Sequence, residues 1–154
     1  MITVTRRYRF SASHRLHISG LSEVQNFALF GKCNNPFGHG HDYALSVTVA
    51  GKVSADTGLI LNTRLLDELI EKNVLRIFSH SNMNVDIPQL ANMVPTTENV
   101  AAAIADMVEE QWPAYFANES ETRLSEVHLQ ETDRNGFAIH IADRSSATRV
   151  VAQR

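Results

Sequence analysis

Cysteine is almost absent from this 154-residue sequence, which contains only Cys33. A single cysteine excludes a disulfide within the chain and is typical of proteins from a reducing compartment. Long apolar runs are also lacking, because the stretch from Val100 to Val108 contains Asp106 and is too short to span a bilayer. The first seven residues alternate in polarity and do not form the apolar core of a signal peptide. We therefore expect a cytoplasmic protein that is not inserted in a membrane.

An excess of positive charge is missing as well. The net charge is −3, the pI is near 6.1, and charged residues are scattered without a long run of one sign. These values argue against a nucleic-acid partner, which would normally select for a basic face. With 44% hydrophobic residues, the chain is long enough to bury one core, so we expect a single domain over residues 1–154.

Alternation of apolar and polar residues predicts four strands. Residues 2–14 and 43–53 form two long alternating segments, and residues 123–131 form a third. The residues at 133–136 read Asp-Arg-Asn-Gly, which predicts a hairpin of the Asn-Gly type leading into a final strand over 137–141. A short additional piece is expected at Val150 and Val151.

Sustained helical spacing is found between the second and third strands. Apolar residues between Leu65 and Ile77 predict a helix with Asn62 or Thr63 as its N-cap. A second helix is expected to begin at residues 96–98 and to stop at Pro113. The segment 15–30 has no sustained period and predicts an insertion loop with a short helical piece.

The resulting order is strand, strand, helix, helix, strand, strand. Strands in runs with the helices as a block predict an α+β fold, in which two helices cover one face of a four-stranded antiparallel sheet. Such a sheet leaves two open edges, which usually require protection. We therefore expect a homo-oligomer.

Three histidines form the strongest candidate for a metal site. His39 and His41 are two residues apart, so their rings project from the same side of an extended chain, and His14 ends the neighbouring strand. Three histidines with an open fourth position are typical of catalytic zinc, although Cys33 could close the site as a fourth ligand. Three other histidines are expected to be unrelated to the site. His128 lies on the strand face opposite Glu131, and His17 and His140 have no partner at ligand spacing.

Three further residues are candidates for chemistry, although each has a simpler explanation. Cys33 lies in a polar loop next to Lys32, where a nearby cation would stabilise its thiolate, but a lone cysteine is most often a small buried apolar residue. His80 could supply a group that titrates at neutral pH as a partner for Cys33. Glu131 is most simply a surface carboxylate, but in a pocket it could accept two N–H bonds from a flat heterocycle.

Taken together, these segments resemble the 6-pyruvoyl-tetrahydropterin synthase / 6-carboxytetrahydropterin synthase family. The matching segments, which run through nearly the whole chain in the order of the family, are Phe10-Ser11-Ala12-Ser13-His14-Arg15-Leu16, Gly31-Lys32-Cys33-Asn34-Asn35-Pro36, Gly38-His39-Gly40-His41-Asp42-Tyr43, Thr57-Gly58, Asn62, Ser79-His80, Val85-Asp86-Ile87-Pro88, Thr96-Thr97-Glu98-Asn99-Val100-Ala101 and Glu131-Thr132-Asp133. Each piece alone is weak, but the combination is specific.

The resemblance implies a tunnelling (T-) fold, in which three chains join their sheets into a barrel and two trimers stack as a homohexamer. It implies zinc on the three histidines, Cys33 and His80 as catalytic groups, and Glu131 as the pterin anchor. Thr96 and Thr97 match positions that line the pterin pocket from a neighbouring subunit. The implied reaction converts 7,8-dihydroneopterin triphosphate to 6-pyruvoyl-tetrahydropterin and triphosphate, with no external redox cofactor.

One position departs from the family pattern. An aspartate usually precedes the catalytic histidine, whereas this chain has Ser79 before His80. A serine can hydrogen-bond but supplies no charge, so we expect slower turnover than in a typical member, and a gain in rate from Ser79→Asp.

Three alternatives remain open. The first is a 6-carboxytetrahydropterin synthase of the deazaguanine (queuosine) pathway, which resembles the chain in its zinc ligands, cysteine and histidine. The length of segment 15–30 and the amino-acid sequence of residues 29–36 favour the pyruvoyl-forming type instead. A non-catalytic metal-binding or assembly protein would add Cys33 to the zinc ligands. A regulatory pterin-binding module would keep Glu131 and the two threonines but tolerate loss of Cys33.

Overall fold

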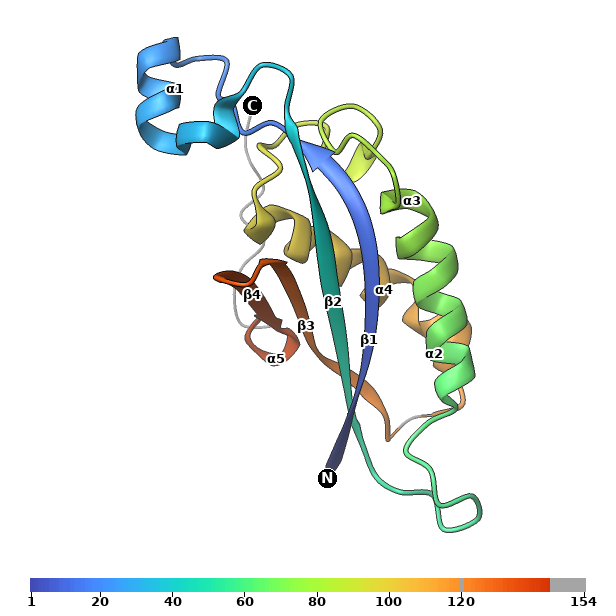
Figure 1. Ribbon diagram of the computed structural model, residues 1–154. Coiled ribbons are helices and arrows are strands. Elements are labelled where there is room, and N and C mark those ends of the chain that lie inside the picture. Colours follow the sequence, from blue (N-terminus) through green and yellow to red (C-terminus); the bar gives the residue numbers. More distant parts are fainter. Residues whose placement is uncertain (120, 145–154) are drawn as a thin grey trace.

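The computed structural model describes residues 1–119 and 121–144, and the expected piece at Val150 and Val151 lies outside them. Four strands form one antiparallel sheet in the order β1-β2-β3-β4 (Figure 1). The strands are β1 (Ile2–His14), β2 (His39–Gly51), β3 (Arg123–Thr132) and β4 (Asn135–His140). The predicted α+β class with neighbouring antiparallel strands is therefore confirmed.

Two helical runs cover one face of this sheet. The first consists of α2 (Thr63–Ile70), a π-turn (Glu71–Leu75) and α3 (Arg76–Phe78), and the second is α4 (Thr97–Phe116). The side chain of Asn62 accepts a hydrogen bond from the Arg64 N–H (3.0 Å), which confirms one of the two predicted N-caps. A short 3-10 turn, Pro88–Leu90, lies in the connection between the two runs.

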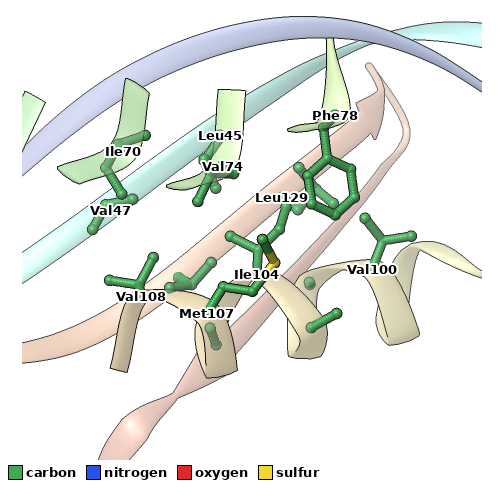
Figure 2. Close-up of a cluster of buried hydrophobic side chains, with 14 of the residues drawn as sticks. Leu45, Val47, Ile70, Val74, Phe78, Val100, Ile104, Met107, Val108 and Leu129 are labelled. Carbon is green, nitrogen blue, oxygen red and sulfur yellow. The ribbon is translucent and has the colours of Figure 1, made fainter. Parts of the chain in front are cut away.

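The core lies between the sheet and the helices. Figure 2 shows Leu45, Val47 and Leu129 of the sheet facing Ile104 and Val108 of α4, and all five are buried. Residues at alternate positions of β2 contribute to this layer, which is why the strand pattern in the sequence was so regular. Burial of this contiguous apolar layer is the main favourable term that holds the helices on the sheet.

Helix α4 passes the point at which Pro113 was expected to end it. It continues to Phe116, so that prediction is wrong. The ring of Phe116 is buried and lies 4.4 Å from the Trp112 ring, centroid to centroid. Packing of this last turn against the core offsets the loss of the backbone hydrogen bond that Pro113 cannot donate.

The end of the sheet differs from the prediction in two details. The hairpin loop is Asp133-Arg134, not Asn135-Gly136, because Asn135 already pairs with Thr132 in β4. Gly136 serves another purpose: a Cβ at this position would lie 2.9 Å from the His128 ring nitrogen Nε2. The last strand ends at His140, and the expected strand residue Ile141 instead begins the short helix α5 (Ile141–Arg144).

The segment before β2 contains the short helical piece that was predicted. Helix α1 (Glu23–Phe30) is followed by a 3-10 turn (Gly31–Asn34), and both lie beyond the end of the sheet where β1 ends and β2 begins (Figure 1). Asn26 is fully buried and its side chain bonds to the backbone of Ile18, Leu21 and Ser22, which fixes α1 to the preceding loop. None of the helices in the described ranges is long and apolar enough to cross a membrane.

Candidate functional site

The three predicted metal ligands meet at one end of the sheet. His14 and His39 lie directly opposite each other in the β1–β2 pairing, and His41 follows on the same side of β2. The loop between the strands brings them together through Gly38, which has a φ of 71° and whose Cβ, if present, would lie 2.9 Å from the His14 carbonyl oxygen. A glycine is therefore required next to the ligands.

One ring nitrogen of each histidine converges on a common point. The three potential ligand atoms lie within 4.8 Å of one another, and the Nε2 atoms of His14 and His39 are 3.2 Å apart. Two nitrogens bound to one tetrahedral zinc at about 2.0–2.1 Å would be about 3.3 Å apart. In the described part of the chain, the buried side-chain polar atoms without a hydrogen-bond partner are His39 Nδ1, His41 Nε2 and the Tyr43 hydroxyl. A cluster of imidazole nitrogens of this size, in which the buried His41 Nε2 has no hydrogen-bond partner, fits a metal ion.

The surroundings of His14 select the form of the ring that can bind a metal. Its Nδ1 lies 2.8 Å from the Pro95 carbonyl oxygen. Because a carbonyl oxygen only accepts, Nδ1 carries the hydrogen and the neutral ring presents the lone pair of Nε2 to the site. Burial lowers the pKa of His14, and burial also lowers the pKa values of His39 and His41. The site therefore favours three neutral imidazoles.

Glu131 faces the histidines from β3. One carboxylate oxygen, Oε1, lies 3.6 Å from the Nε2 atoms of both His14 and His41, which is too long for a hydrogen bond. Glu131 is the extra residue on β3 where the pairing with β4 shifts between Gln130 and Thr132. Such a bulge redirects side chains at the end of a strand, and here it places a carboxylate beside the metal ligands.

The two predicted threonines have different environments. Thr97 is buried, and its hydroxyl donates a hydrogen bond to Glu131 Oε1 (2.7 Å) of the same chain, whereas the family resemblance implied a neighbouring subunit. Thr96 is the N-cap of α4, and its hydroxyl accepts from the Asn99 N–H at 3.4 Å. Thr97 therefore orients the carboxylate directly, while Thr96 fixes the start of the helix that carries Thr97.

Cys33 lies near this site but not among the converging donor atoms. The 3-10 turn that carries it is attached to the segment after β1: the Leu16 N–H donates to the Cys33 carbonyl oxygen (2.8 Å), and Arg15 Nε donates to the Asn34 carbonyl oxygen (3.1 Å). Among the described residues, the group of metal-binding donors contains the three histidines without Cys33. Burial and the nearby charge of Glu131 raise the pKa of the Cys33 thiol, so its thiolate requires added positive charge.

His80 lies outside the cluster of three histidines. It follows α3 and has a φ of 59°, a left-handed conformation that is uncommon for a residue other than glycine. Its N–H donates to the Ser11 carbonyl oxygen (2.6 Å), so the segment lies along the open edge of β1. His80 borders a cavity with Ser11 and Asp42, two side chains on the sheet face opposite to His14 and His41. Among the described residues, no hydrogen bond or ion pair joins His80 to Cys33 or to the three histidines, although His41 also borders this cavity.

The structure also identifies residues that sequence reasoning missed. The Pro95 carbonyl fixes the ring of His14, and the side-chain oxygen of Asn34 accepts a hydrogen bond from His17 Nδ1 (2.9 Å), which helps to hold the turn with Cys33. Neither contact has a sequence signal, because the partners are 81 and 17 positions apart. The other two histidines predicted to be unrelated are also outside the site, since His140 pairs with Glu126 and His128 packs on Gly136.

Known proteins match both the sequence and the fold. A family model described as 6-pyruvoyl tetrahydropterin synthase matches residues 3–141. The 6-pyruvoyl tetrahydrobiopterin synthase of Homo sapiens is 42% identical over 132 residues, which is 86% of each chain. The 6-carboxy-5,6,7,8-tetrahydropterin synthase of Bacillus subtilis is 31% identical over 129 residues, which is 81% of each chain.

Among solved structures, the Caenorhabditis elegans 6-pyruvoyl tetrahydropterin synthase superposes with a TM-score of 0.79 at 34% identity, covering 90% of this chain and 94% of that one. This likeness confirms the predicted tunnelling fold. Family model, sequence relatives and fold agree, and the chain belongs to the 6-pyruvoyl tetrahydropterin synthase family.

Proposed function

We propose that this chain is a zinc-dependent 6-pyruvoyl-tetrahydropterin synthase. The observation that carries the proposal is the convergence of three imidazoles beside a carboxylate that is oriented by Thr97, in a chain of this family. The substrate would be 7,8-dihydroneopterin triphosphate. Loss of triphosphate accompanies reduction of the ring and oxidation of the side chain, so the reaction balances without an external electron donor.

His14, His39 and His41 would hold the metal. Three imidazole ligands with an open fourth position suit zinc in a catalytic role. When bound, zinc supplies Lewis-acid polarisation of the substrate oxygen atoms next to the carbon that loses a proton.

The remaining residues would bind the pterin and move protons. Glu131, held by Thr97, would accept N–H bonds from the amidine-like edge of the pterin ring, and Thr96 would keep Thr97 in place. Cys33 would take the proton from the substrate carbon, and His80 would relay one. Because no hydrogen bond or ion pair among the described residues joins His80 to Cys33, this His80 would come from a neighbouring chain.

The pyruvoyl product is proposed on the basis of similarity. The human relative, a 6-pyruvoyl tetrahydrobiopterin synthase, is 42% identical to this chain, whereas the 6-carboxy relative from Bacillus subtilis is 31% identical. A 6-carboxytetrahydropterin synthase is the second candidate, because that relative still spans most of both chains.

The open edges of the sheet support the proposed assembly. In the described part of the chain, β1 is bordered on its outer side only near its end, where Ser13 bridges to Asn82, and β4 has no strand beyond it. Pairing between such edges would close a barrel and remove them. We therefore propose a homohexamer of two stacked trimers in the cytoplasm.

A product assay tests this function. The zinc-loaded protein is incubated with 7,8-dihydroneopterin triphosphate, and the product is identified by mass spectrometry. We expect 6-pyruvoyl-tetrahydropterin and triphosphate. A carboxy product with released acetaldehyde would support the second candidate instead. Absence of turnover with zinc bound and the hexamer intact would overturn both and indicate a pterin-binding protein without this activity.

A further inference from the structure

Asn34 is a buried polar residue that directly follows Cys33 in the 3-10 turn beyond the end of the sheet (Figure 1). Only 6% of its surface is exposed. A buried amide requires partners for both its oxygen and its nitrogen, because an unpaired buried polar group costs free energy. Among the described residues, the side chains that bond to Asn34 all belong to the segment 15–30, which the proposed reaction leaves without a role.

Three side chains bond to the amide of Asn34. Its Oδ1 accepts hydrogen bonds from His17 Nδ1 (2.9 Å) and from Arg15 Nη2 (3.4 Å). Its Nδ2 donates to Glu23 Oε2 of α1 (3.3 Å), and this carboxylate also lies 3.7 Å from Arg15 Nη2. An amide oxygen only accepts and an amide nitrogen only donates, so the directions of these bonds are fixed. Because an aspartate would lack the donor and an alanine would lack both groups, the arrangement requires an amide at this position.

The backbone of the turn is bonded to the same segment. Arg15 Nε donates to the Asn34 carbonyl oxygen (3.1 Å). Arg15 directly follows His14 of the metal site, and the side chain of Asn84 bonds to both its N–H (2.7 Å) and its carbonyl oxygen (2.9 Å). The bonds of Asn34 therefore connect the turn that carries the thiol to the strand that carries a candidate metal ligand.

We propose that Asn34 is the positioning residue of Cys33. It joins the turn to Arg15 after β1 and to Glu23 on α1, so the thiol is held where it takes the proton from the substrate carbon. The segment 15–30 then supports the turn that carries the catalytic thiol. The inference rests on the proposed function, since it assigns a role within that reaction.

Asn34→Asp tests this role with a side chain of the same shape. It keeps the oxygen that accepts from His17, but it replaces the donor to Glu23 with a second oxygen, so that two carboxylates repel each other. We expect kcat to fall roughly ten- to a hundredfold, because a misplacement of about 1 Å can cost about 10² in rate, with KM and zinc content unchanged. Asp67→Asn, which weakens the contact of α2 with β1, is the control for a general loss of stability and should keep the wild-type kcat.

An exchange of the two groups separates positioning from the effect of a new charge. In the double variant Asn34→Asp/Glu23→Gln, an amide at position 23 donates to a carboxylate at position 34. The bond is thereby restored in the opposite direction, and the net charge equals that of the wild type. We expect the double variant to recover most of the kcat that Asn34→Asp loses. A double variant as slow as Asn34→Asp, or an Asn34→Asp variant as fast as the wild type, would overturn the proposal.

Alkylation of Cys33 distinguishes failure of this inference from failure of the proposed function. Because the chain has no other cysteine, the rate at which iodoacetamide labels Cys33 can be followed by mass spectrometry whether or not product forms. Asn34→Ala removes the bonds of the amide without adding charge, so it should release the turn and raise the labelling rate severalfold, while Asp67→Asn keeps the wild-type rate. Equal rates in Asn34→Ala and the wild type would overturn the role of Asn34. The expected rates in a protein that forms no product would support the positioning of Cys33 and overturn only the proposed function.

Discussion

The ring of His14 shows how much a single position contributes to this site. It is 1% exposed, it donates through Nδ1 to the Pro95 carbonyl, and it therefore directs Nε2 toward His39 and His41. A histidine this deeply buried without a ligand would leave unpaired nitrogen atoms around it, which proteins usually avoid.

His14→Ala should abolish retention of zinc. Removing one of three ligands leaves two imidazoles, which hold zinc too weakly to survive dialysis. Zinc content measured by mass spectrometry after dialysis is expected to fall from about one ion per chain to a small fraction. His140→Ala, which removes a histidine paired with Glu126 at the surface, should keep the metal. Equal zinc contents in the two variants would exclude the three-histidine site.

Cys33→Ala distinguishes an enzyme from a binding protein. Because the Cys33 thiol lies outside the converging donors, the variant should retain zinc, while loss of the proposed base should lower kcat by about 10²–10⁴-fold. Zinc content and product formation are measured on the same sample. Loss of zinc would instead make Cys33 a fourth ligand, and unchanged turnover would remove it from the mechanism.

At the scale of elements, the β1–β2 hairpin carries the ligands and its loop must fit closely beneath them. Gly38→Ala should cost about 1–2 kcal/mol for the left-handed φ alone, and its Cβ would press on the His14 carbonyl at 2.9 Å. We expect a melting temperature lower by several degrees and reduced zinc content. Gly20→Ala, where a Cβ meets nothing within 4 Å, is the matched control and should change neither. A stable, zinc-replete Gly38→Ala protein would refute this account of the loop.

Helix α2 is attached to β1 by a charged contact at Asp67. Its carboxylate accepts two hydrogen bonds from Arg6 (3.0 and 2.6 Å) and one from the Tyr8 hydroxyl (2.8 Å). Burial alone would raise the pKa of Asp67, but the bonds from Arg6 and Tyr8 outweigh it and lower the pKa below its ordinary value of 3.8. The stabilisation is therefore complete above pH 3.8 and is lost as the pH falls through the lowered value.

Asp67→Asn should reproduce that dependence. At neutral pH the variant should melt at a lower temperature than the wild type, and the difference should shrink as the pH falls below about 3.8. Melting curves of both proteins between pH 3 and pH 7 test this, with Glu68→Gln, which removes only the pair of Glu68 with Lys72 in the following π-turn, as the control. A difference that stays constant over the whole range would show that the charge of Asp67 is not what matters.

At the scale of the whole molecule, one chain does not complete the proposed active site. Cys33 lies close enough to Glu131 for that charge to raise its pKa, whereas no hydrogen bond or ion pair among the described residues joins His80 to Cys33 or to the three histidines. The proposed pairing of Cys33 with His80 would therefore draw on two chains, with the sheet edges as the proposed contact.

Mixing two inactive variants tests this division. Cys33→Ala and His80→Ala chains, unfolded together and reassembled at equal concentration, should recover about a quarter of the wild-type activity, because that fraction of random sites contains both intact groups. Separately reassembled variants serve as the blank, and light scattering reports whether the assembly is a hexamer. If the mixture stays inactive while the hexamer forms, Cys33 and His80 act within one chain or not together.

How well each feature of the fold could be predicted from the sequence depended on the range of the interactions that determine it. Strand alternation placed His14, His39 and His41 correctly, because side-chain direction in a strand follows from the position of the residue alone. The end of α4 was missed, since burial of Phe116 outweighs the local effect of Pro113. The hairpin was misassigned because Gly136 is required by the His128 ring across the pair of strands, not by a turn.

The sequence by itself determined the four strands, the α+β class and the grouping of His14, His39 and His41, since these depend on periodicity and on side-chain direction along each strand. Only the tertiary structure decided the Pro95 carbonyl as the partner of His14, the contact of Thr97 with Glu131, and the separation of His80 from Cys33. These contacts join residues 34 to 81 positions apart or depend on which face of the sheet a loop reaches. No local pattern encodes such distances, because they arise when the helices and the sheet pack together.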